Sequence, residues 1–266
     1  MVLNKERIVR AIKRFQSRYK DYTGLYNSSS REEAINWFKQ NDSRILNGNI
    51  LRTKIVQGLV KASGSDIFIE TGTSHAATTI GVNRYLNIPV WSCENSPSDF
   101  KISQFLTLGL SNIQLFNLDS IKFLEHITPI LKKDKKIPIF YLDAHEGALD
   151  ATSLPLADEI RILKPLDEFI VVIDDFKIPH DPEFVYGTYG GISIDLGLIS
   201  NVLLELGINQ CFLPAYKCKE ETGFVTGFCI FWRSKQLDSK IDFNQFPFNL
   251  LKEYSVKSEN NIVANA

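Results

Sequence analysis

The stretch Asp66-Ile67-Phe68-Ile69-Glu70-Thr71-Gly72-Thr73-Ser74-His75-Ala76 decides the fold. An apolar run of strand length enters a tight turn at Gly72, and a segment with helix periodicity follows from Thr78 to Leu86. A glycine in such a turn lets the backbone approach a ligand closely, and the free amides at a helix start favour anions. The stretch therefore predicts a strand, turn and helix of an α/β fold, with a ligand at the turn.

Outward from this stretch, short apolar runs alternate with segments of helix periodicity. This alternation is typical of a mostly parallel sheet, and right-handed crossovers place the helices on both of its faces. The predicted strands are Ile67–Ile69, Val90–Cys93, Ile113–Phe116, Ile137–Leu142 and Phe169–Ile173. The predicted helices are Thr78–Leu86, Phe100–Leu108, Ser120–Leu131, Leu156–Leu163 and Ile192–Leu206.

The C-terminal part of the pattern is different. Two further strand-like runs, Gln210–Pro214 and Thr226–Trp232, are joined by a polar loop that leaves no room for a crossover helix. Such runs pair as an antiparallel hairpin. We therefore predict a Rossmann-like, seven-stranded, mostly parallel sheet that ends in an antiparallel hairpin.

The N-terminal part of the chain has helix periodicity. Apolar residues recur three and four apart in Ile8, Ile12 and Phe15, and the same spacing returns between Ile50 and Val60. Between these segments, Ser28 to Ser30 precede two glutamates and predict a capped helix start. We expect an N-terminal helical cap over residues 1–63, a main domain over 64–254 and a flexible tail over 255–266. Whether the cap forms a homodimer stays open.

Composition limits the classes of partner. The chain of 266 residues has 30 basic and 31 acidic residues, which gives no electrostatic footprint for nucleic acid or an anionic membrane surface. A small-molecule or sugar substrate fits this balance better. The charged N-terminus is unlike a signal peptide and no long apolar run occurs, so we expect a cytoplasmic protein. The four cysteines form no Cys-x-x-Cys pair, which favours buried free thiols over a zinc site.

A parallel sheet finished by an antiparallel hairpin resembles the fold of the class I S-adenosylmethionine-dependent methyltransferases. The turn after the first strand resembles their first motif, although that motif has glycines at the positions of Gly72, Ser74 and Ala76 and only the first is kept. The resemblance implies that the cofactor is bound by this turn, through Glu70, Thr71, Gly72, Thr73 and Ser74. Taken alone, Glu70 could equally cap the turn that follows it.

Acids follow the second and third predicted strands. Glu94, with Asn95 beside it, lies 24 residues after Glu70, and an acid there can accept hydrogen bonds from both ribose hydroxyls of a nucleoside. A nicotinamide cofactor would satisfy Glu94 equally well. After the third strand come Asp119 and Ser120, where the methyltransferase family places an acid or amide that receives the adenine amino group. The alternative is that either residue caps the next helix.

Three carboxylates follow the fourth and fifth strands. Asp143 ends one strand, and Asp174 and Asp175 end its neighbour, so all three should meet at one edge of the sheet. Three anions at one place require a cation or a proton, and oxygen ligands favour magnesium or calcium. The alternative is that Asp174 or Asp175 caps the loop after the strand and pairs with a lysine.

The pattern Leu142-Asp143 with Ile173-Asp174-Asp175-Phe176 resembles the metal-dependent O-methyltransferases of the catechol and macrolide-sugar types, over roughly Asp66 to Trp232. This resemblance implies Mg2+ or another divalent cation held by Asp143, Asp174 and Asp175, with Asp143 also beside the transferring methyl and cofactor. The catechol type has a lysine base where this chain has Glu146. We therefore predict His145 as the general base, with a ligand or supporting role as the alternative.

A loop rich in glycine and aromatic residues follows the fifth strand, and His180, Tyr186 and Tyr189 in it are candidate substrate contacts; ordinary loop packing is the alternative. The resulting hypothesis is metal-assisted O-methylation of a hydroxyl on a sugar or small metabolite. Two others stay open. One is a non-haem-iron hydroxylase-like oxidoreductase with His145 and His180 as ligands. The other is a non-catalytic nucleoside-binding protein of the same fold.

Overall fold

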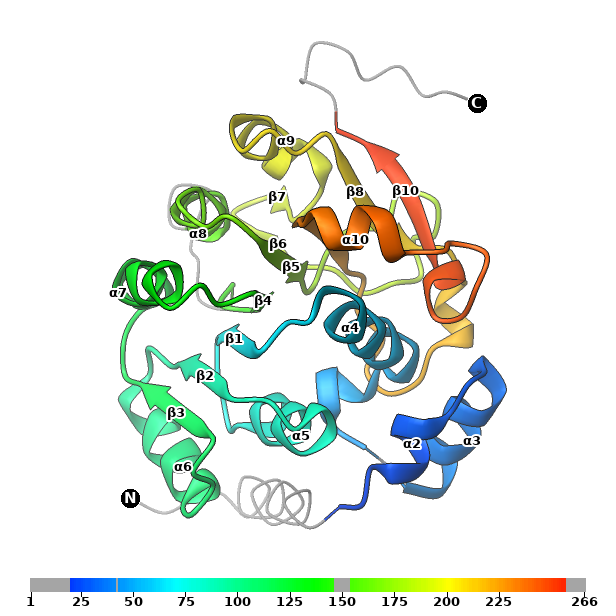
Figure 1. The fold of residues 1–266 in the computed structure, drawn as a ribbon, viewed down its shortest axis with the longest axis horizontal. Coiled ribbons are helices and arrows are strands. Elements are labelled where there is room, and N and C mark those ends of the chain that lie inside the picture. Colours follow the sequence, from blue (N-terminus) through cyan, green and yellow to red (C-terminus); the bar gives the residue numbers. More distant parts are fainter. Residues whose placement is uncertain (1–19, 42, 146–153, 257–266) are drawn as a thin grey trace.

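The computed structural model describes residues 20–41, 43–145 and 154–256. Its centre is an eight-stranded sheet in the order β10-β8-β9-β5-β4-β1-β2-β3 (Figure 1). The strands are β1 (Ile67–Thr71), β2 (Val90–Cys93), β3 (Ile113–Phe116), β4 (Pro138–Leu142), β5 (Phe169–Ile173), β8 (Gln210–Pro214), β9 (Cys229–Arg233) and β10 (Leu251–Ser255). The five strands predicted before the hairpin are all present, three of them with the predicted bounds.

The sheet is parallel from β3 to β5, and its remaining strands alternate in direction. β1 pairs in parallel with both β2 and β4, whereas β9 is antiparallel to β5 and to β8. The predicted fold class, a mostly parallel sheet that ends in an antiparallel hairpin, is therefore confirmed. The sheet has one more strand than expected, because β10 pairs with β8 at the edge. Lys252 and Glu253 are both exposed in this edge strand and left no apolar run to predict a strand from.

Helices cover both faces of the sheet (Figure 1). One face carries α7 (Ser120–Lys133), α8 (Leu156–Ile162) and α9 (Leu196–Glu205). The other carries α4 (Ile50–Ser63), α5 (Ala77–Leu86) and α10 (Lys235–Lys240), with α6 (Pro97–Thr107) packed on α5 through Leu106 and Ile80. Helix α9 begins four residues later than predicted, because β7 (Ile192–Ser193) pairs with β6 (Thr188–Tyr189) as a small separate hairpin.

The N-terminal helices α2 (Thr23–Asn27) and α3 (Arg31–Asn41) pack beside α4. Helix α3 follows the predicted serine run and has Glu32 and Glu33 in its first turn. Lys54 and Gln57 of α4 donate hydrogen bonds to carbonyls of α2. Leu25 belongs to the same buried core as the strands. The division into residues 1–63, 64–254 and 255–266 stays a prediction. The segment around Ile8 and the chain after residue 256 lie outside the described residues.

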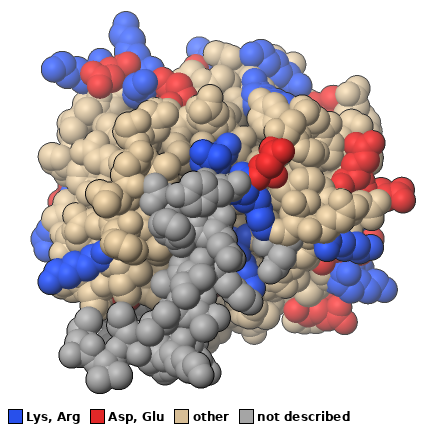
Figure 2. Space-filling model, turned by 90° about the horizontal axis from the view of Figure 1, so that it is seen from below, with Lys and Arg blue, Asp and Glu red and all other residues tan. Residues whose placement is uncertain are grey.

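Short 3-10 helices complete the described structure: η1 (Ile45–Gly48), η3 (Cys218–Glu220) and η4 (Phe248–Leu250). Among the residues described, no helix is long and apolar enough to cross a membrane. Figure 2 shows acidic and basic side chains interspersed on the face that it draws. The predictions of a small-molecule partner, of no nucleic acid or membrane partner, and of a cytoplasmic location remain predictions.

The position of the candidate site follows from the burial and register of the central strands. β1, β4 and β5 are buried along their whole length, so packing on both faces fixes their register. Thr71 is level with Cys93 and with Leu142, and Leu142 is level with Ile173. The residues that follow these four strand ends therefore emerge side by side at one edge of the sheet.

Candidate functional site

The turn after β1 has a backbone suited to glycine at three places. Gly72, Ser74 and Ala76 have φ angles of 86°, 47° and 59°, all in the left-handed region. These are the three positions at which the methyltransferase motif has glycines. A Cβ on Gly72 would lie 2.5 Å from the backbone oxygen of Asp143. Gly72 is thus required by the close approach of the β4 end, and the turn keeps the motif's backbone shape although its sequence departs from it.

This strain predicts that Ser74→Gly stabilises the protein. A left-handed residue with a side chain costs roughly 1–2 kcal/mol, and the greater freedom of glycine in the unfolded chain returns about half of that. We expect the free energy of unfolding to rise by about 0.5–1 kcal/mol, measured by urea denaturation. Ser239→Gly in helix α10 is the matched control and should lower it. A loss of stability in both variants would contradict the prediction.

Glu94 connects this turn to the end of β2. Its carboxylate accepts hydrogen bonds from the backbone amides of Ser74 (2.7 Å) and Ser96 (2.8 Å). Asn117 donates to the Glu94 carbonyl at 2.7 Å, which adds the end of β3 to the group. The carboxylate is half-buried, and Asn95 beside it is exposed. The structure therefore brings Glu94 and the β1 turn together at one accessible rim.

Glu70 lies beneath this rim rather than on it. Its side chain is buried and accepts hydrogen bonds from the hydroxyls of Ser92 (2.6 Å) and Thr79 (2.5 Å). Burial raises the pKa of Glu70 to about 7, although both hydroxyls act to lower it. Thr71 and Thr73 are buried as well, and Thr73 is 2.6 Å from the Ser92 hydroxyl. These contacts favour the alternative in which Glu70 organises the turn, while Gly72 and Ser74 stay accessible.

Asp119 caps helix α7. Its carboxylate accepts from the Lys122 amide at 2.9 Å and pairs with the Lys122 ammonium at 2.7 Å. Ser120 is the first residue of the helix and is buried. The capping alternative thus accounts for the Asp119 side chain, and contact of Asp119 or Ser120 with an adenine stays a prediction.

The acids after β4 and β5 differ in their surroundings. Burial raises the pKa of Asp143 well above its usual range, and the charges of Asp174 and Asp175 raise it further. Burial would likewise raise the pKa of Asp174, but Arg52 and hydrogen-bond donors hold it below its usual value. Asp175 has a left-handed φ of 54° and is half-buried.

The Arg52 guanidinium, from helix α4, lies against Asp174 at 2.6 Å, and both side chains are completely buried. Arg52 was missed in the sequence, although a signal was present. It lies three and seven residues before Ile55 and Leu59, on the buried stripe of the helix. A charge at such a position requires a buried partner.

The predicted magnesium site does not fit these surroundings. Both oxygens of Asp174 accept hydrogen bonds, from Arg52, Thr226 and the Asp175 amide on one side and from Tyr141 and Asn47 on the other. An ionised carboxylate has about four lone-pair sites, so Asp174 has none left for a metal. Within the described ranges, no three His, Cys, Asp or Glu side chains are grouped to hold a metal ion.

His145 is buried at the end of β4. Its Nε2 lies 3.2 Å from the Leu142 carbonyl, so Nε2 carries the hydrogen and Nδ1 keeps its lone pair. Nδ1 has no hydrogen-bond partner among the described residues. Burial lowers the pKa of His145 to about 4, which keeps the ring neutral. The Tyr189 ring is 6.5 Å away, between ring centroids. Glu146 lies outside the described residues.

His180 and Tyr186 have other contacts. His180 uses Nε2 to contact the Pro214 carbonyl at 2.9 Å, and Nδ1 accepts from the Tyr254 hydroxyl at 2.6 Å. With both ring nitrogens occupied, His180 does not fit the iron-ligand alternative. Tyr186 is 36% exposed and lies under the Lys177 ammonium. Of the three predicted substrate contacts, Tyr189 alone has a ring contact with His145 given by the described residues.

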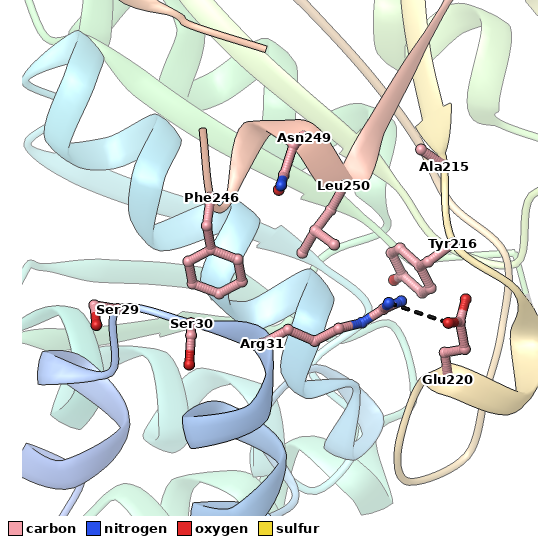
Figure 3. Close-up of a pocket in the computed structure, with 9 residues that line it drawn as sticks. All are labelled: Ser29, Ser30, Arg31, Ala215, Tyr216, Glu220, Phe246, Asn249 and Leu250. Atoms are coloured by element: carbon pink, nitrogen blue, oxygen red, sulfur yellow. Dashed lines mark hydrogen bonds and ion pairs between the residues drawn. The ribbon is translucent and has the colours of Figure 1, made fainter. Parts of the chain in front are cut away.

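Among the described residues, cavities also lie away from this strand edge. The first, of about 370 Å3, lies between α3 and the segment before β10, where Arg31 points to Glu220 (Figure 3). The second, of about 600 Å3, includes Asp167 and Trp232. None of the predicted site residues lines either cavity. The candidate site is therefore a rim at the strand ends and not one of these cavities.

Comparison with known proteins gives solved structures only, since no family model matches the chain and no curated protein does. A putative O-methyltransferase from Klebsiella pneumoniae is 12% identical, with 87% of this chain and 91% of that chain covered and a TM-score of 0.45. An O-methyltransferase from Bacillus cereus in complex with SAH is 16% identical, with 75% and 88% covered and a TM-score of 0.43.

A fibrillarin pre-rRNA processing protein from Methanococcus jannaschii is also similar, at 17% identity and a TM-score of 0.35. The match covers 48% of this chain and 55% of that chain. The similar structures thus include class I S-adenosylmethionine-dependent O-methyltransferases, all at low identity. The fold class defined by the strand order of this chain, a Rossmann-like methyltransferase sheet, rests on its own topology.

Proposed function

We propose that the protein is an S-adenosylmethionine-dependent methyltransferase that methylates an oxygen of a sugar or other small metabolite. The observation that carries the proposal is the turn from Gly72 to Ala76. It keeps three left-handed residues at the motif's glycine positions, and Glu94 bridges it to the next strand. A ligand-binding turn of this shape explains why strain is retained at Ser74 and Ala76.

The cofactor, when bound, supplies an electrophilic methyl group, and this chain's residues provide binding, orientation and a proton acceptor. The left-handed backbone at Gly72 and Ser74 would let the cofactor approach the turn closely, and Glu94 would accept from ribose hydroxyls. Nδ1 of the neutral His145 ring, which has no hydrogen-bond partner among the described residues, would accept from the hydroxyl of the acceptor. Asp143 would lie beside the reacting groups, and Tyr189 would line the acceptor side. A divalent cation is not part of this proposal, because Asp174 has no free lone pair.

Calorimetric titration with S-adenosylmethionine and S-adenosylhomocysteine tests the proposal. We expect both to bind, and Glu94→Gln to weaken binding about tenfold or more, since hydrogen bonds to a charged group contribute about 1.5–3 kcal/mol. Glu205→Gln on the exposed side of α9 is the matched control and should leave the affinity unchanged. NAD is titrated in parallel because Glu94 would fit its ribose too. Binding of NAD with no binding of either sulfur cofactor would overturn the proposal.

A non-catalytic nucleoside-binding protein would bind the same cofactors without turnover. Nδ1 of His145, without a partner in the part of the chain that the structure describes, favours the enzyme, because an acceptor hydroxyl would satisfy this buried lone pair. Incubation with labelled cofactor and hydroxylated metabolites, comparing the protein with His145→Leu, separates the two.

A further inference from the structure

The cluster of carboxylates at the ends of β4 and β5, formed by Asp143, Asp174 and Asp175, already contains a cation. Arg52 reaches it from helix α4, and Asp174 reaches it from the end of β5. Both side chains have no exposed surface, and the charged atoms are 2.6 Å apart. The sequence required a cation where three carboxylates meet. The structure places a guanidinium there, from a residue more than a hundred positions earlier in the chain.

The carboxylate of Asp174 is fully engaged. Oδ1 accepts from Arg52 Nη1 at 2.6 Å, from the Thr226 hydroxyl at 2.5 Å and from the Asp175 amide at 2.8 Å. Oδ2 accepts from the Tyr141 hydroxyl and from Asn47 Nδ2 at 3.0 Å. A metal ion could bind Asp174 only if at least one of these five donors left, and a buried donor without a partner costs about 1–3 kcal/mol.

The guanidinium is also held on its other sides. Arg52 Nη2 donates to the Thr226 carbonyl and, at 2.9 Å, to the Thr226 hydroxyl, while Nη1 is 3.1 Å from the Tyr141 hydroxyl. The Phe228 ring lies 4.9 Å from the guanidinium carbon. The backbone amide of Arg52 donates to the Glu221 carboxylate at 3.1 Å, which fixes the backbone that carries the guanidinium. A planar group with donors in a fixed fork suits this arrangement, whereas a lysine ammonium does not.

We propose that Arg52 takes the charge-neutralising place of a divalent metal at this strand edge, so that Asp143, Asp174 and Asp175 bind no divalent cation. Arg52 is then a positioning residue. It fixes Asp174, and Asp174 in turn accepts from the Asp175 amide and holds the left-handed turn that follows β5. The inference goes beyond methyl transfer, and its Mn2+ titration requires neither cofactor nor acceptor.

Titration of the full chain with Mn2+, followed by the electron paramagnetic resonance signal of the free ion, tests the inference directly. For the wild-type protein we expect no stoichiometric loss of that signal up to millimolar Mn2+. Calorimetry with S-adenosylhomocysteine should give the same affinity, within about twofold, in Mg2+ and in EDTA. Uptake of one Mn2+ per chain that Asp174→Asn abolishes would overturn the inference.

Mn2+ titration of the variant Arg52→Met is a second test of the inference. Removal of the guanidinium leaves Asp174 short of positive charge, so the folded variant should bind Mn2+ more tightly than the wild-type protein does. A folded Arg52→Met protein that takes up no more Mn2+ than wild type would contradict the replacement of a metal by Arg52. Arg161→Met, which removes an exposed guanidinium paired with Asp158 and Glu205, is the matched control and should change nothing. If Arg52→Met does not fold, the wild-type titration still decides the question.

Discussion

Replacing Arg52 by Met is expected to lower the free energy of unfolding by about 3–5 kcal/mol, which is typical for breaking a buried ion pair from one side. The loss arises because Asp174 stays completely buried with four polar donors but without its cation. The Met side chain fills most of the volume beside Phe228, so the effect reports charge and hydrogen bonding more than a cavity. Urea denaturation at neutral pH, with the slope checked for two-state behaviour, measures it.

Two further variants show where the loss comes from. Arg52→Lys keeps the charge and should recover only part of the stability, because one ammonium cannot reach Asp174 and Thr226 together. In a double-mutant cycle with Asp174→Asn, the combined variant should lose less than the sum of the single losses. The exposed Arg161→Met control should cost about 1 kcal/mol or less. A loss of about 1 kcal/mol or less for Arg52→Met would show that Arg52 does not compensate the buried charge of Asp174.

The elements that the sequence predicted well are the parallel strands. β5 has the predicted bounds because a strand of a parallel sheet, covered on both faces, is a continuous apolar run. β2 and β3 also have the predicted bounds, although β3 lies at the edge of the sheet and is only partly buried. β10 lies at the edge, and its exposed residues Lys252, Glu253 and Ser255 leave no continuous apolar run. The start of α9 was placed too early for a related reason. Ile192 is apolar but belongs to a two-residue strand, and so short a pairing has no sequence period.

The residues of the candidate site also differ in how far the sequence could predict their positions. Glu94 could be placed beside the β1 turn from strand order alone, because neighbouring parallel strands end side by side. Arg52 could not, since nothing in strand order says which residue of a distant helix reaches the edge. The expectation of a cation near Asp143, Asp174 and Asp175 agrees with the structure, in which the Arg52 guanidinium pairs with Asp174. Magnesium at Asp174 stays a prediction that the structure does not favour, because Arg52, Tyr141, Thr226 and Asn47 occupy its oxygens, which the sequence does not show.

Glu159→Gln is expected to stabilise the protein above neutral pH and to have little effect in acid. Glu159 of α8 is completely buried, and neither carboxyl oxygen has a hydrogen-bond partner among the described residues. Burial raises its pKa from 4.5 to about 7, although the nearby Ser120 and Thr71 hydroxyls act to lower it. Since the folded state holds this proton more tightly, the contribution of Glu159 to stability is complete below 4.5 and is lost as the pH rises through about 7.

A glutamine cannot ionise, so the variant escapes that loss. At about pH 8 we expect its free energy of unfolding to exceed that of the wild-type protein by about 1–3 kcal/mol, and at about pH 4.5 by almost nothing. Urea denaturation at the two pH values measures the difference, with Glu205→Gln on α9 as the exposed control. Glu70 has a pKa raised in the same direction, so the variant should keep some of the wild-type pH dependence. An equal effect at both pH values would mean that Glu159 has the same pKa in the folded and unfolded states, so that burial does not raise it.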